Sequence, residues 1–371
     1  MKKISIFGKS KKKHEKRIPL HPSLFDQIPP IVKENLYFEE GYASELGVSD
    51  SFLRDEFGGT APREELYDIG DVWVLPKPEI DDFKYFKEGK ILWGWPHCVQ
   101  GYDIAQAAID SKMTLVAWEA MHGGSDTTHV FYRNNELAGY AAVQHMMMLS
   151  GKTGYFGRKL RAGVLGFGAT ARGAINCLKS LGIVDISVFS QRPSYLINAP
   201  IESIDYRKIK VNSEGVLLES NSYQEFKKPV EELKNYDIVV NCVLQDPINP
   251  VMFIEENDIS SIEKPIDIID ISCDKGMGFS FAIPTTFDNP VFNYGKFIKY
   301  YSVDHTPTLY WDSASYELTK SLIDFLPSFV DGTWKENKIL EKAIEIEDGQ
   351  IRNEKIIDFQ KRSRIYPYEV K

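Results

Sequence analysis

Four polar side chains follow apolar runs in the first third of the sequence, and together they could hold a carboxylate and move protons. Arg17 can grip a carboxylate through two parallel hydrogen bonds. Lys77 could polarise a neighbouring carbonyl, and His97 titrates near neutrality, as a general acid or base must. Glu119 could keep Lys77 charged or bind a substrate ammonium. The alternative for each is a surface residue, or for Glu119 a buried salt bridge.

A glycine-rich turn in the middle of the chain could bind a dinucleotide. Gly166, Gly168 and Ala171 form the pattern G-x-G-x-x-A between an apolar run at 162–165 and an amphipathic stretch at 169–181. Gly166 would allow a tight turn, Gly168 would let a pyrophosphate approach the backbone, and Ala171 would allow close helix packing. Ala169 and Thr170 would open the helix and offer N–H groups to the phosphates. The alternative is that these small residues only permit close packing in an α/β core.

The residues after the next apolar run, 186–189, indicate which dinucleotide is bound. An NAD site usually carries Asp or Glu there, but this chain has Ser190, Gln191 and Arg192. Without a carboxylate to repel a 2′-phosphate, NADP(H) is favoured over NAD(H). If Arg192 is only a solvated turn residue, the choice of cofactor stays open.

The elements that must position these groups alternate between strand and helix. Strands are predicted at 4–7, 36–39, 72–75, 91–95 and 114–118, with a helix at 103–111. After a buried helix at 136–150 come the glycine unit and strands at 237–243, 267–272 and 301–303. Residues 200–228 look like a hairpin or excursion. A helix at 313–326 has Ser313 as its predicted N-cap, and Pro327 should end or kink it.

The tail at 343–371 reads as strand, Asp-Gly turn and helix, and we expect it to pack on the first part of the chain. The pattern therefore predicts an α/β protein with two Rossmann-like domains and an active-site cleft between them. Residues 1–137 and 305–371 would form a discontinuous substrate domain. Residues 138–304 would form the inserted nucleotide-binding domain.

Composition narrows the class of protein. The 371 residues are 43% hydrophobic and 26% charged with a net charge of -9, which is typical of soluble globular proteins and argues against nucleic acid. A basic run from Lys9 to Lys13, with Lys16 and Arg17, is either a solvated loop or an attractor of anionic substrates. The sequence shows no membrane-length apolar segment and no signal-peptide pattern. Four scattered cysteines, without metal or redox spacing, favour the cytoplasm and no metal.

Five short segments carry a family pattern. They are HEKRIPLHP at 14–22, VLPK at 74–77, GWPH at 94–97, AGY at 138–140 and DISCD at 270–274. As a set they resemble the alanine dehydrogenase and pyridine nucleotide transhydrogenase superfamily, with its E-x-R-x-x-L-x-P opening, substrate Lys and His motifs, bridging helix and D-x-x-x-D strand end. The resemblance covers about residues 3–330.

Two further segments indicate the opine-forming branch of that superfamily. VNCV at 240–243 and SVDHTPTL at 302–309 are similar to lysine-forming saccharopine dehydrogenases. GWPH at 94–97, AGYAA at 138–142 and the missing acidic residue after 186–189 resemble N5-(carboxyethyl)ornithine synthases. The glycine turn differs from that of the saccharopine enzymes.

The resemblance implies NADPH-dependent condensation of a 2-oxo acid, such as pyruvate or 2-oxoglutarate, with the amino group of an ornithine-like or lysine-like amino acid. Arg17 would fix the oxo-acid carboxylate, while Lys77 and His97 would move protons as carbinolamine becomes imine. The remaining expected site residues are Asp274 (catalytic), Glu119, Asp304 and His305 (substrate), and Cys242 and Val243 (cofactor).

Two other functions stay open. One is an alanine-type dehydrogenase that uses ammonia, and the other is a catalytically silent NADPH-binding regulator. The joint presence of Arg17, Lys77, His97 and Asp274 argues against the regulator, which needs no acid/base pair. The expected partners are small molecules, and a homo-oligomer is allowed. The identity of both substrates and the physiological direction stay open.

Overall fold

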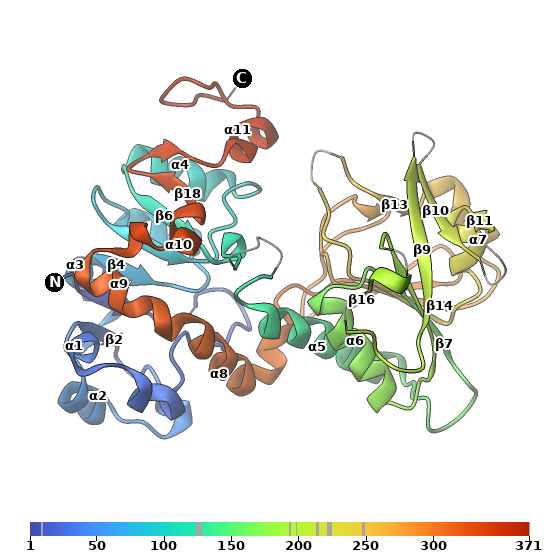
Figure 1. Cartoon of the computed structure of the whole chain (residues 1–371), viewed down its shortest axis with the longest axis horizontal. Coiled ribbons are helices and arrows are strands. Elements are labelled where there is room, and N and C mark those ends of the chain that lie inside the picture. Colours follow the sequence, from blue (N-terminus) through green and yellow to red (C-terminus); the bar gives the residue numbers. More distant parts are fainter. Residues whose placement is uncertain are drawn as a thin grey trace. The chain divides into compact units, whose positions relative to one another are not determined.

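The computed structural model describes residues 1–8, 10–123, 128–192, 194–197, 199–212, 215–220, 225–246 and 249–370. It divides into two compact units (Figure 1): unit 1 is Met1–Tyr132 with Tyr310–Lys371, and unit 2 is Arg133–Leu309. The predicted domain crossings, after 137 and before 305, lie inside helix α5 (Tyr132–Ser150) and just before a 3-10 helix, η7 (Thr306–Tyr310). Each unit contains a large, mainly parallel sheet, which confirms the predicted α/β class with two Rossmann-like units.

Two sequence predictions fall partly on residues that the structure does not describe. Lys9 of the basic run, and residues 213–214 and 221–224 of the predicted excursion, lie outside the described residues.

Unit 1 is built, within the described residues, on an eight-stranded sheet in the order β19-β18-β6-β5-β4-β1-β2-β3. The strands are β1 (Ile4–Ile6), β2 (Leu36–Glu39), β3 (Gly59–Ala61), β4 (Val72–Val74), β5 (Ile91–Gly94), β6 (Thr114–Ala117), β18 (Ile344–Glu347) and β19 (Gln350–Ile351). Strands β1 to β6 are parallel, and β18 pairs antiparallel with β6. The tail therefore completes this sheet, as its pattern predicts. Sequence analysis missed β3, whose Gly-Thr-Ala sequence has no apolar alternation.

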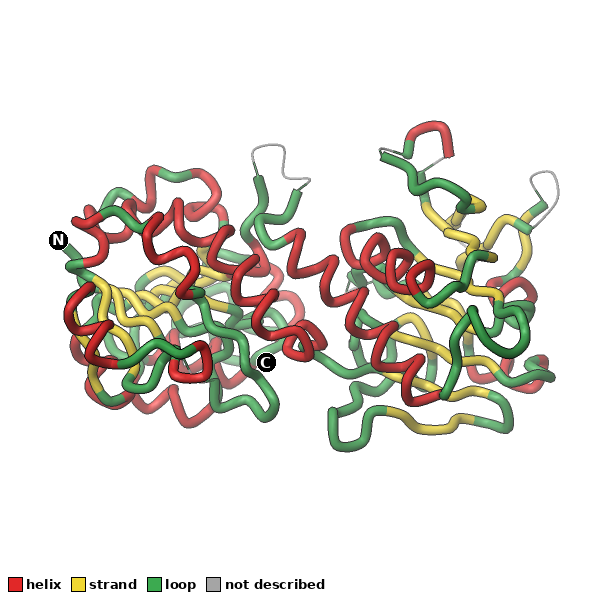
Figure 2. The backbone as a smooth tube through the Cα atoms, turned by 90° about the horizontal axis from the view of Figure 1, so that it is seen from below, coloured by secondary structure: helices red, strands yellow, loops and turns green. Residues whose placement is uncertain are grey.

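Helices cover both faces of this sheet (Figure 2), so its strands are buried on both sides. Trp93 packs with the helices of one face and Leu92 with those of the other. In Figure 1 the orange and red C-terminal segment lies alongside the blue N-terminal strands. The helices are α1 (Pro30–Lys33), α2 (Asp50–Glu56), α3 (Arg63–Ile69), α4 (Tyr102–Asp110), α8 (Trp311–Leu322), α9 (Leu326–Asp331), α10 (Lys338–Lys342) and α11 (Glu354–Gln360).

The start of α8 differs from the prediction. The helix begins at Trp311 after Tyr310, with no side-chain cap, so the predicted N-cap Ser313 is wrong. The preceding 3-10 turn η7 runs directly into α8, so the chain is already wound two residues before Ser313. The predicted break is confirmed, because a 3-10 stretch at Ile323–Phe325 separates α8 from α9 and Pro327 lies in the first turn of α9.

Unit 2 contains, in the described part of the chain, a nine-stranded sheet in the order β11-β10-β9-β8-β7-β12-β14-β17-β16. Its six central strands, from β9 to β17, are parallel and follow the Rossmann order, which reverses between β7 and β12. The strands are β7 (Arg161–Leu165), β8 (Asp185–Ser190), β9 (Asp205–Asn212), β10 (Gly215–Glu219), β11 (Phe226–Lys227), β12 (Ile238–Asn241), β14 (Ile266–Asp270), β16 (Val291–Tyr294) and β17 (Ile298–Tyr301).

Two predictions for this unit can be compared with these strands. The excursion at 200–228 contains the predicted hairpin, because β9 and β10 pair antiparallel. The strand predicted at 301–303 is placed too late: β17 ends at Tyr301, and the following residues form the loop at its end. A separate two-stranded sheet joins β13 (Met252–Ile254) to β15 (Gly278–Phe279). No helix among the described residues is both long and apolar enough to cross a membrane.

Two glycines let helices α5 and α6 (Ala169–Ser180) touch through their backbones. A Cβ at Gly139 would lie 1.9 Å from the carbonyl oxygen of Thr170, and one at Gly173 would lie 1.7 Å from that of Glu136. Neither position therefore has room for a side chain. This close contact fixes the first turns of α6, which follow the predicted dinucleotide turn, against the start of α5. The third helix of the unit is α7 (Pro229–Leu233).

Gly173→Ala tests this contact. In a solvated helix the change would favour folding by about 1 kcal/mol. Here the added methyl group meets a backbone carbonyl, so we expect a net loss of about 1–3 kcal/mol in the free energy of unfolding. Urea unfolding followed by circular dichroism measures it. Asn176→Ala, on the exposed side of the same helix, should change it by less than about 0.5 kcal/mol. Equal stability of the two variants would contradict the contact.

Candidate active site

A glycine brings Lys77 and His97 together at the end of the sheet in unit 1. The chain stays paired beyond β4 and β5, because the Trp95 N–H donates to the carbonyl of Pro76 (2.9 Å). A Cβ at Gly94 would lie 1.9 Å from the carbonyl oxygen of Leu75, so only glycine allows this approach. As a result, Nζ of Lys77 lies 3.1 Å from Nε2 of His97.

The contact between Nζ and Nε2 suits a proton transfer within this pair. A charged lysine has three donors and no acceptor, so next to it Nε2 of His97 would accept and Nδ1 would carry the ring proton. Nδ1 of His97 lies 3.6 Å from Oε1 of Glu119. Lys77 is buried, whereas the His97 side chain is 51% exposed. His97 has a φ of 49°, an uncommon backbone conformation for a residue other than glycine. The pair can therefore exchange a proton and also reach solvent through the imidazole.

Arg17 is held rigidly next to this pair. It is 3% exposed, and its Nε and Nη2 donate to the two carboxylate oxygens of Glu15 at 2.8 and 2.6 Å. Its guanidinium also lies over the Trp95 ring, 4.8 Å from the centroid, and the Lys77 ammonium lies 5.4 Å from the same centroid. Burial alone would raise the pKa of Glu15, but the charge and hydrogen bonds of Arg17, with the charge of Lys77, hold it at about 2. Both partners are therefore charged at neutral pH.

Glu119 completes this group from the end of the neighbouring strand, β6. It lies in a 3-10 turn, η4 (Trp118–Ala120), directly after β6, and its Oε1 accepts from the His97 N–H at 2.6 Å. Its Oε2 is buried and, among the described residues, accepts no hydrogen bond. Burial raises the pKa of Glu119 to about 8, and the charge of Glu345 adds to this rise, against the effects of His97 N–H and Lys77. The carboxyl group is thus near its titration point at neutral pH.

Sequence reasoning missed three members of this group. Glu15 fixes Arg17, Trp95 stacks below two cations, and His129 holds the Glu119 turn. Nδ1 of His129 accepts from the Phe131 N–H, so Nε2 donates to the carbonyl of Glu119 at 3.2 Å. Burial, together with the nearby His122, lowers the pKa of His129 to about 4, so the ring is neutral. The Glu-x-Arg spacing in the sequence could have revealed Glu15.

In unit 2 the glycine turn has the geometry that a pyrophosphate needs. Gly166 has a φ of 90°, and Gly168, which caps α6, has no neighbouring atom within 4 Å of the position of a Cβ. Its backbone is therefore open, and Ala169 and Thr170 begin a 12-residue helix whose N–H groups face the turn. Ala171 is fully buried, in agreement with close helix packing.

The end of β8 carries the residues expected to select the dinucleotide. Ser190 is buried and its Oγ accepts from the N–H of Arg192 at 3.1 Å, while the side chains of Gln191 and Arg192 are exposed. No acidic side chain occupies this turn at 190–192. The exposed turn at 190–192 and the open turn at Gly168 have room for a pyridine dinucleotide.

Asp270, a buried carboxylate to which sequence reasoning gave no role, links β12, β14 and β17 through hydrogen bonds. Asp270 accepts from Asn241 Nδ2 (3.0 Å), the N–H of Ser272 (3.2 Å) and the hydroxyl of Tyr300 (2.6 Å). Burial raises its pKa to about 7, although Tyr300 and Asn241 oppose the rise. Asn241 Oδ1 in turn accepts from the N–H of Val243 at 3.2 Å. This network fixes the turn of Cys242 and Val243 next to the glycine turn, where Cys242 N–H also donates to Leu165.

The remaining predicted residues of unit 2 gather around Cys273. This residue has a φ of 58° and directly precedes Asp274, while burial, with the charges of Asp304, Asp270 and Asp274, raises the pKa of its thiol well above the usual value. The N–H of His305 donates to Oδ1 of Asp304 at 2.6 Å, and His305 also has a left-handed φ of 48°. Unit 1 thus brings Arg17, Lys77, His97 and Glu119 together, and the other predicted residues lie in unit 2. Among the described residues no cluster has the composition of a metal site.

A model of the alanine dehydrogenase/PNT C-terminal domain family matches residues 137–354, which is more than half of the sequence. The chain belongs to this family. It is therefore an oxidoreductase of a pyridine nucleotide-binding family that acts on amino acids.

Relatives with different names are similar to this chain. The N(5)-(carboxyethyl)ornithine synthase of Clostridium botulinum (strain Hall) is 24% identical over 329 residues, covering 82% of this chain and 90% of that protein. The alanine dehydrogenase of Lysinibacillus sphaericus is 24% identical over 381 residues, covering 96% of each. Two solved structures share the fold: an L-alanine dehydrogenase (TM-score 0.76, 16% identity, 96% and 98% covered) and a Sinorhizobium meliloti transhydrogenase (0.69, 18%, 94% and 99%).

The raised pKa of Glu119 predicts a pH-dependent contribution to stability. The folded protein keeps this proton up to about pH 8, whereas the unfolded chain loses it near 4.5, so rising pH between these values lowers stability. Glu119→Gln removes this term. We expect the stability of the variant relative to wild type to increase from pH 5 to pH 8 in urea unfolding. The exposed Glu65→Gln is the control, and a pH-independent difference for Glu119→Gln would refute the assignment.

Proposed function

We propose that this chain catalyses the NADPH-dependent reductive condensation of a 2-oxo acid, pyruvate or 2-oxoglutarate, with the amino group of an ornithine-like or lysine-like amino acid. The product is a secondary amine, as in N5-(carboxyethyl)ornithine synthases and saccharopine dehydrogenases. The observation that carries the proposal is the 3.1 Å contact between Lys77 and His97 next to the buried cation of Arg17. A protein that only binds NADPH has no need of such a proton-exchanging pair.

Arg17 binds the carboxylate of the 2-oxo acid. Glu15 accepts hydrogen bonds from Nε and Nη2 of Arg17, and the guanidinium lies over the ring of Trp95. These two contacts keep the cation in one orientation. Because the cation is fixed before substrate binds, little conformational entropy is lost when it holds the carboxylate.

Lys77 and His97 handle the protons of condensation. The amine nitrogen attacks the keto carbon to form a carbinolamine, and the pair removes a proton from nitrogen and supplies one to oxygen. Loss of water then leaves an imine, to which a further proton gives the iminium form. Glu119 lies beyond His97 and, with its pKa of about 8, can take up or return a proton, or bind the substrate ammonium. Asp274 is the proposed third catalytic residue, and Asp304 and His305 contact substrate.

Unit 2 holds the dinucleotide. Gly166, Gly168 and the first N–H groups of α6 would hold the pyrophosphate, and the turn of Cys242 and Val243 would contact the dinucleotide from the next strand. When bound, the reduced nicotinamide supplies the hydride that converts the iminium carbon to the secondary amine. The absence of an acidic residue at 190–192 and the exposed Arg192 support NADPH over NADH.

The second candidate is an alanine-type dehydrogenase with ammonia as the amine. It is supported by the match to alanine dehydrogenases over nearly the whole chain. The same Arg17, Lys77 and His97 would serve it, since the proton transfers are the same. The opine reaction is supported by the GWPH segment at 94–97 and by the similarity to a carboxyethylornithine synthase.

Varying the amine separates these functions. We expect NADPH oxidation, followed at 340 nm, with pyruvate or 2-oxoglutarate only when ornithine or lysine is present. Ammonia and arginine are tested in parallel, and a sample without amine is the blank. If NADPH is oxidised with ammonia as the amine but not with any of the amino acids, the opine reaction is refuted in favour of the alanine type. If no combination oxidises NADPH, the chain is not this enzyme, and NADPH binding alone would point to a regulator.

Arg192→Ala tests the choice of cofactor. Loss of a charged contact to the 2′-phosphate should weaken NADPH binding about tenfold or more, with NADH binding unchanged. Isothermal titration calorimetry measures both dissociation constants. Lys296→Ala removes an exposed positive charge elsewhere in unit 2 and is the matched control. An unchanged ratio of the two constants in Arg192→Ala would show that this arginine does not select NADPH.

A further inference from the structure

The loop that carries His97 has an uncommon backbone conformation. It covers residues 95–101, between β5 and α4, and His97 within it has a left-handed φ of 49°. The N–H of His97 donates to Glu119, and its carbonyl accepts from the N–H of Gly101 at 2.8 Å. A left-handed conformation costs free energy in a residue with a side chain, so it persists only where the surrounding contacts enforce it. The contacts of the next two residues therefore bear on the position of the imidazole.

Gln360, the last residue of α11, supplies these contacts from the C-terminal segment. Its Nε2 donates to the carbonyls of Cys98 (2.8 Å) and Val99 (3.2 Å). Its Oε1 accepts from Nε of Arg362 at 2.6 Å. Because an arginine nitrogen can only donate, the amide oxygen of Gln360 must face Arg362 and the NH2 group must face the loop. The NH2 group therefore holds the two residues that follow His97.

Arg362 is itself fixed on α4. It is buried, and its guanidinium lies 4.8 Å from the centroid of the Tyr102 ring. Its Nη1 donates to Oε1 of Gln106 (2.8 Å) and to the carbonyl of Tyr368 (3.2 Å). Tyr102 and Gln106 lie one turn apart in α4. The arginine therefore links α11 to the helix that directly follows the loop.

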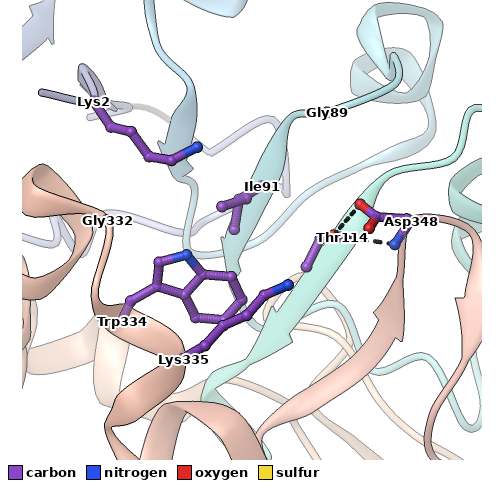
Figure 3. A pocket seen from close by; sticks show the side chains of 8 residues that line it. All are labelled: Lys2, Gly89, Ile91, Thr114, Gly332, Trp334, Lys335 and Asp348. Atoms are coloured by element: carbon purple, nitrogen blue, oxygen red, sulfur yellow. Dashed lines mark hydrogen bonds between the residues drawn. The ribbon is translucent and has the colours of Figure 1, made fainter.

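The start of the C-terminal segment is anchored at the other end of α4. Between β18 and β19 the N–H of Asp348 donates to Oγ1 of Thr114, which in turn donates to Oδ1 of Asp348 (Figure 3). The N–H of Gly349 donates to the carbonyl of Met113 at 3.0 Å, and a Cβ at Gly349 would lie 2.8 Å from the carbonyl oxygen of Ile109. Ile109 belongs to the last turn of α4. Contacts at both ends of α4 thus give α11 one position relative to the loop.

We propose that Gln360 is a positioning residue that keeps His97 at hydrogen-bonding distance from Lys77. The proposal rests on the proton transfer proposed for that pair, and Gln360 acts through the carbonyls of Cys98 and Val99. When these carbonyls lose their donor, they must find another partner, and the loop can relax from the left-handed conformation of His97. The imidazole then moves away from Nζ of Lys77. The C-terminal segment thus serves the site as well as the sheet edge that β18 covers.

Gln360→Glu tests this role with little change of shape. The variant keeps an acceptor for Arg362, but it places a carboxylate oxygen instead of an NH2 group against two carbonyls. Carbon-13 labelling of histidine at Cε1 gives the readout: of the seven histidines, His97 is the one whose resonance disappears in His97→Gln. Lys77→Met should shift this resonance in the wild type. In the Gln360→Glu background we expect about half of that shift or less, because the two side chains no longer touch.

Gln350→Glu is the matched control. Gln350 lies in the same segment, and its Oε1 accepts from the hydroxyl of Tyr368 at 2.8 Å, which a carboxylate oxygen can also do. The shift caused by Lys77→Met should therefore be the same in this variant as in the wild type. The proposal is overturned if Lys77→Met shifts the His97 resonance equally in the wild type and in Gln360→Glu.

Kinetics give a second readout. Gln360→Glu should lower kcat about tenfold or more, as misplacement of a proton-transferring group does, and leave the dissociation constant of NADPH unchanged. An unchanged kcat would also overturn the proposal. The spectra need no turnover, so the two proposals fail separately. If the wild type oxidises no NADPH, the proposed reaction is contradicted, whereas equal shifts of the His97 resonance contradict the positioning role.

Discussion

The candidate site in unit 1 depends on one steric constraint: there is no room for a side chain at residue 94. Because Gly94 lies against the carbonyl of Leu75, the chain after β5 stays paired with the chain after β4. This pairing places an ammonium and an imidazole at hydrogen-bonding distance and sets Trp95 below Lys77 and Arg17. The positions of Lys77, His97 and Trp95 relative to one another therefore depend on the absence of a side chain at residue 94.

The two units solve the problem of burying charge in different ways. In unit 1 the buried Arg17 is matched by a buried carboxylate, so both groups stay ionised and the guanidinium keeps one orientation. In unit 2 the hydrogen bonds to Asp270 come from neutral donors on β12, on β17 and just after β14. Because no cation offsets its burial, the ionised form of Asp270 is less favoured. The role of Asp270 is to fix three neighbouring strand ends around the turn of Val243.

The sequence predicted most of the fold because long apolar runs and the glycine turn are local signals. Strands β1, β2, β4, β5 and β6 were placed within a residue or so, whereas β3 was missed because Gly-Thr-Ala has no apolar pattern. The start of α8 was misplaced because its first turn continues a 3-10 helix, which leaves no capping signal. Trp95, His129 and Asp270 were not assigned, because they have partners on neighbouring strands or turns that depend on strand order. Pairings of this kind cannot be read from periodicity. Glu15 was missed although its partner Arg17 is only two residues away.

The insertion of unit 2 has a consequence for how the chain is made. Unit 2 is continuous in sequence, so all of its strands are synthesised before residue 310. Unit 1 must wait: α8 and α9 supply one of its cores, and β18 covers the open edge of β6. During translation the strands β1 to β6 thus remain without one apolar cover while a complete domain folds behind them. The segment from residue 310 onward therefore completes unit 1 last. A nascent chain that ends before β18 has β6 as an uncovered edge strand.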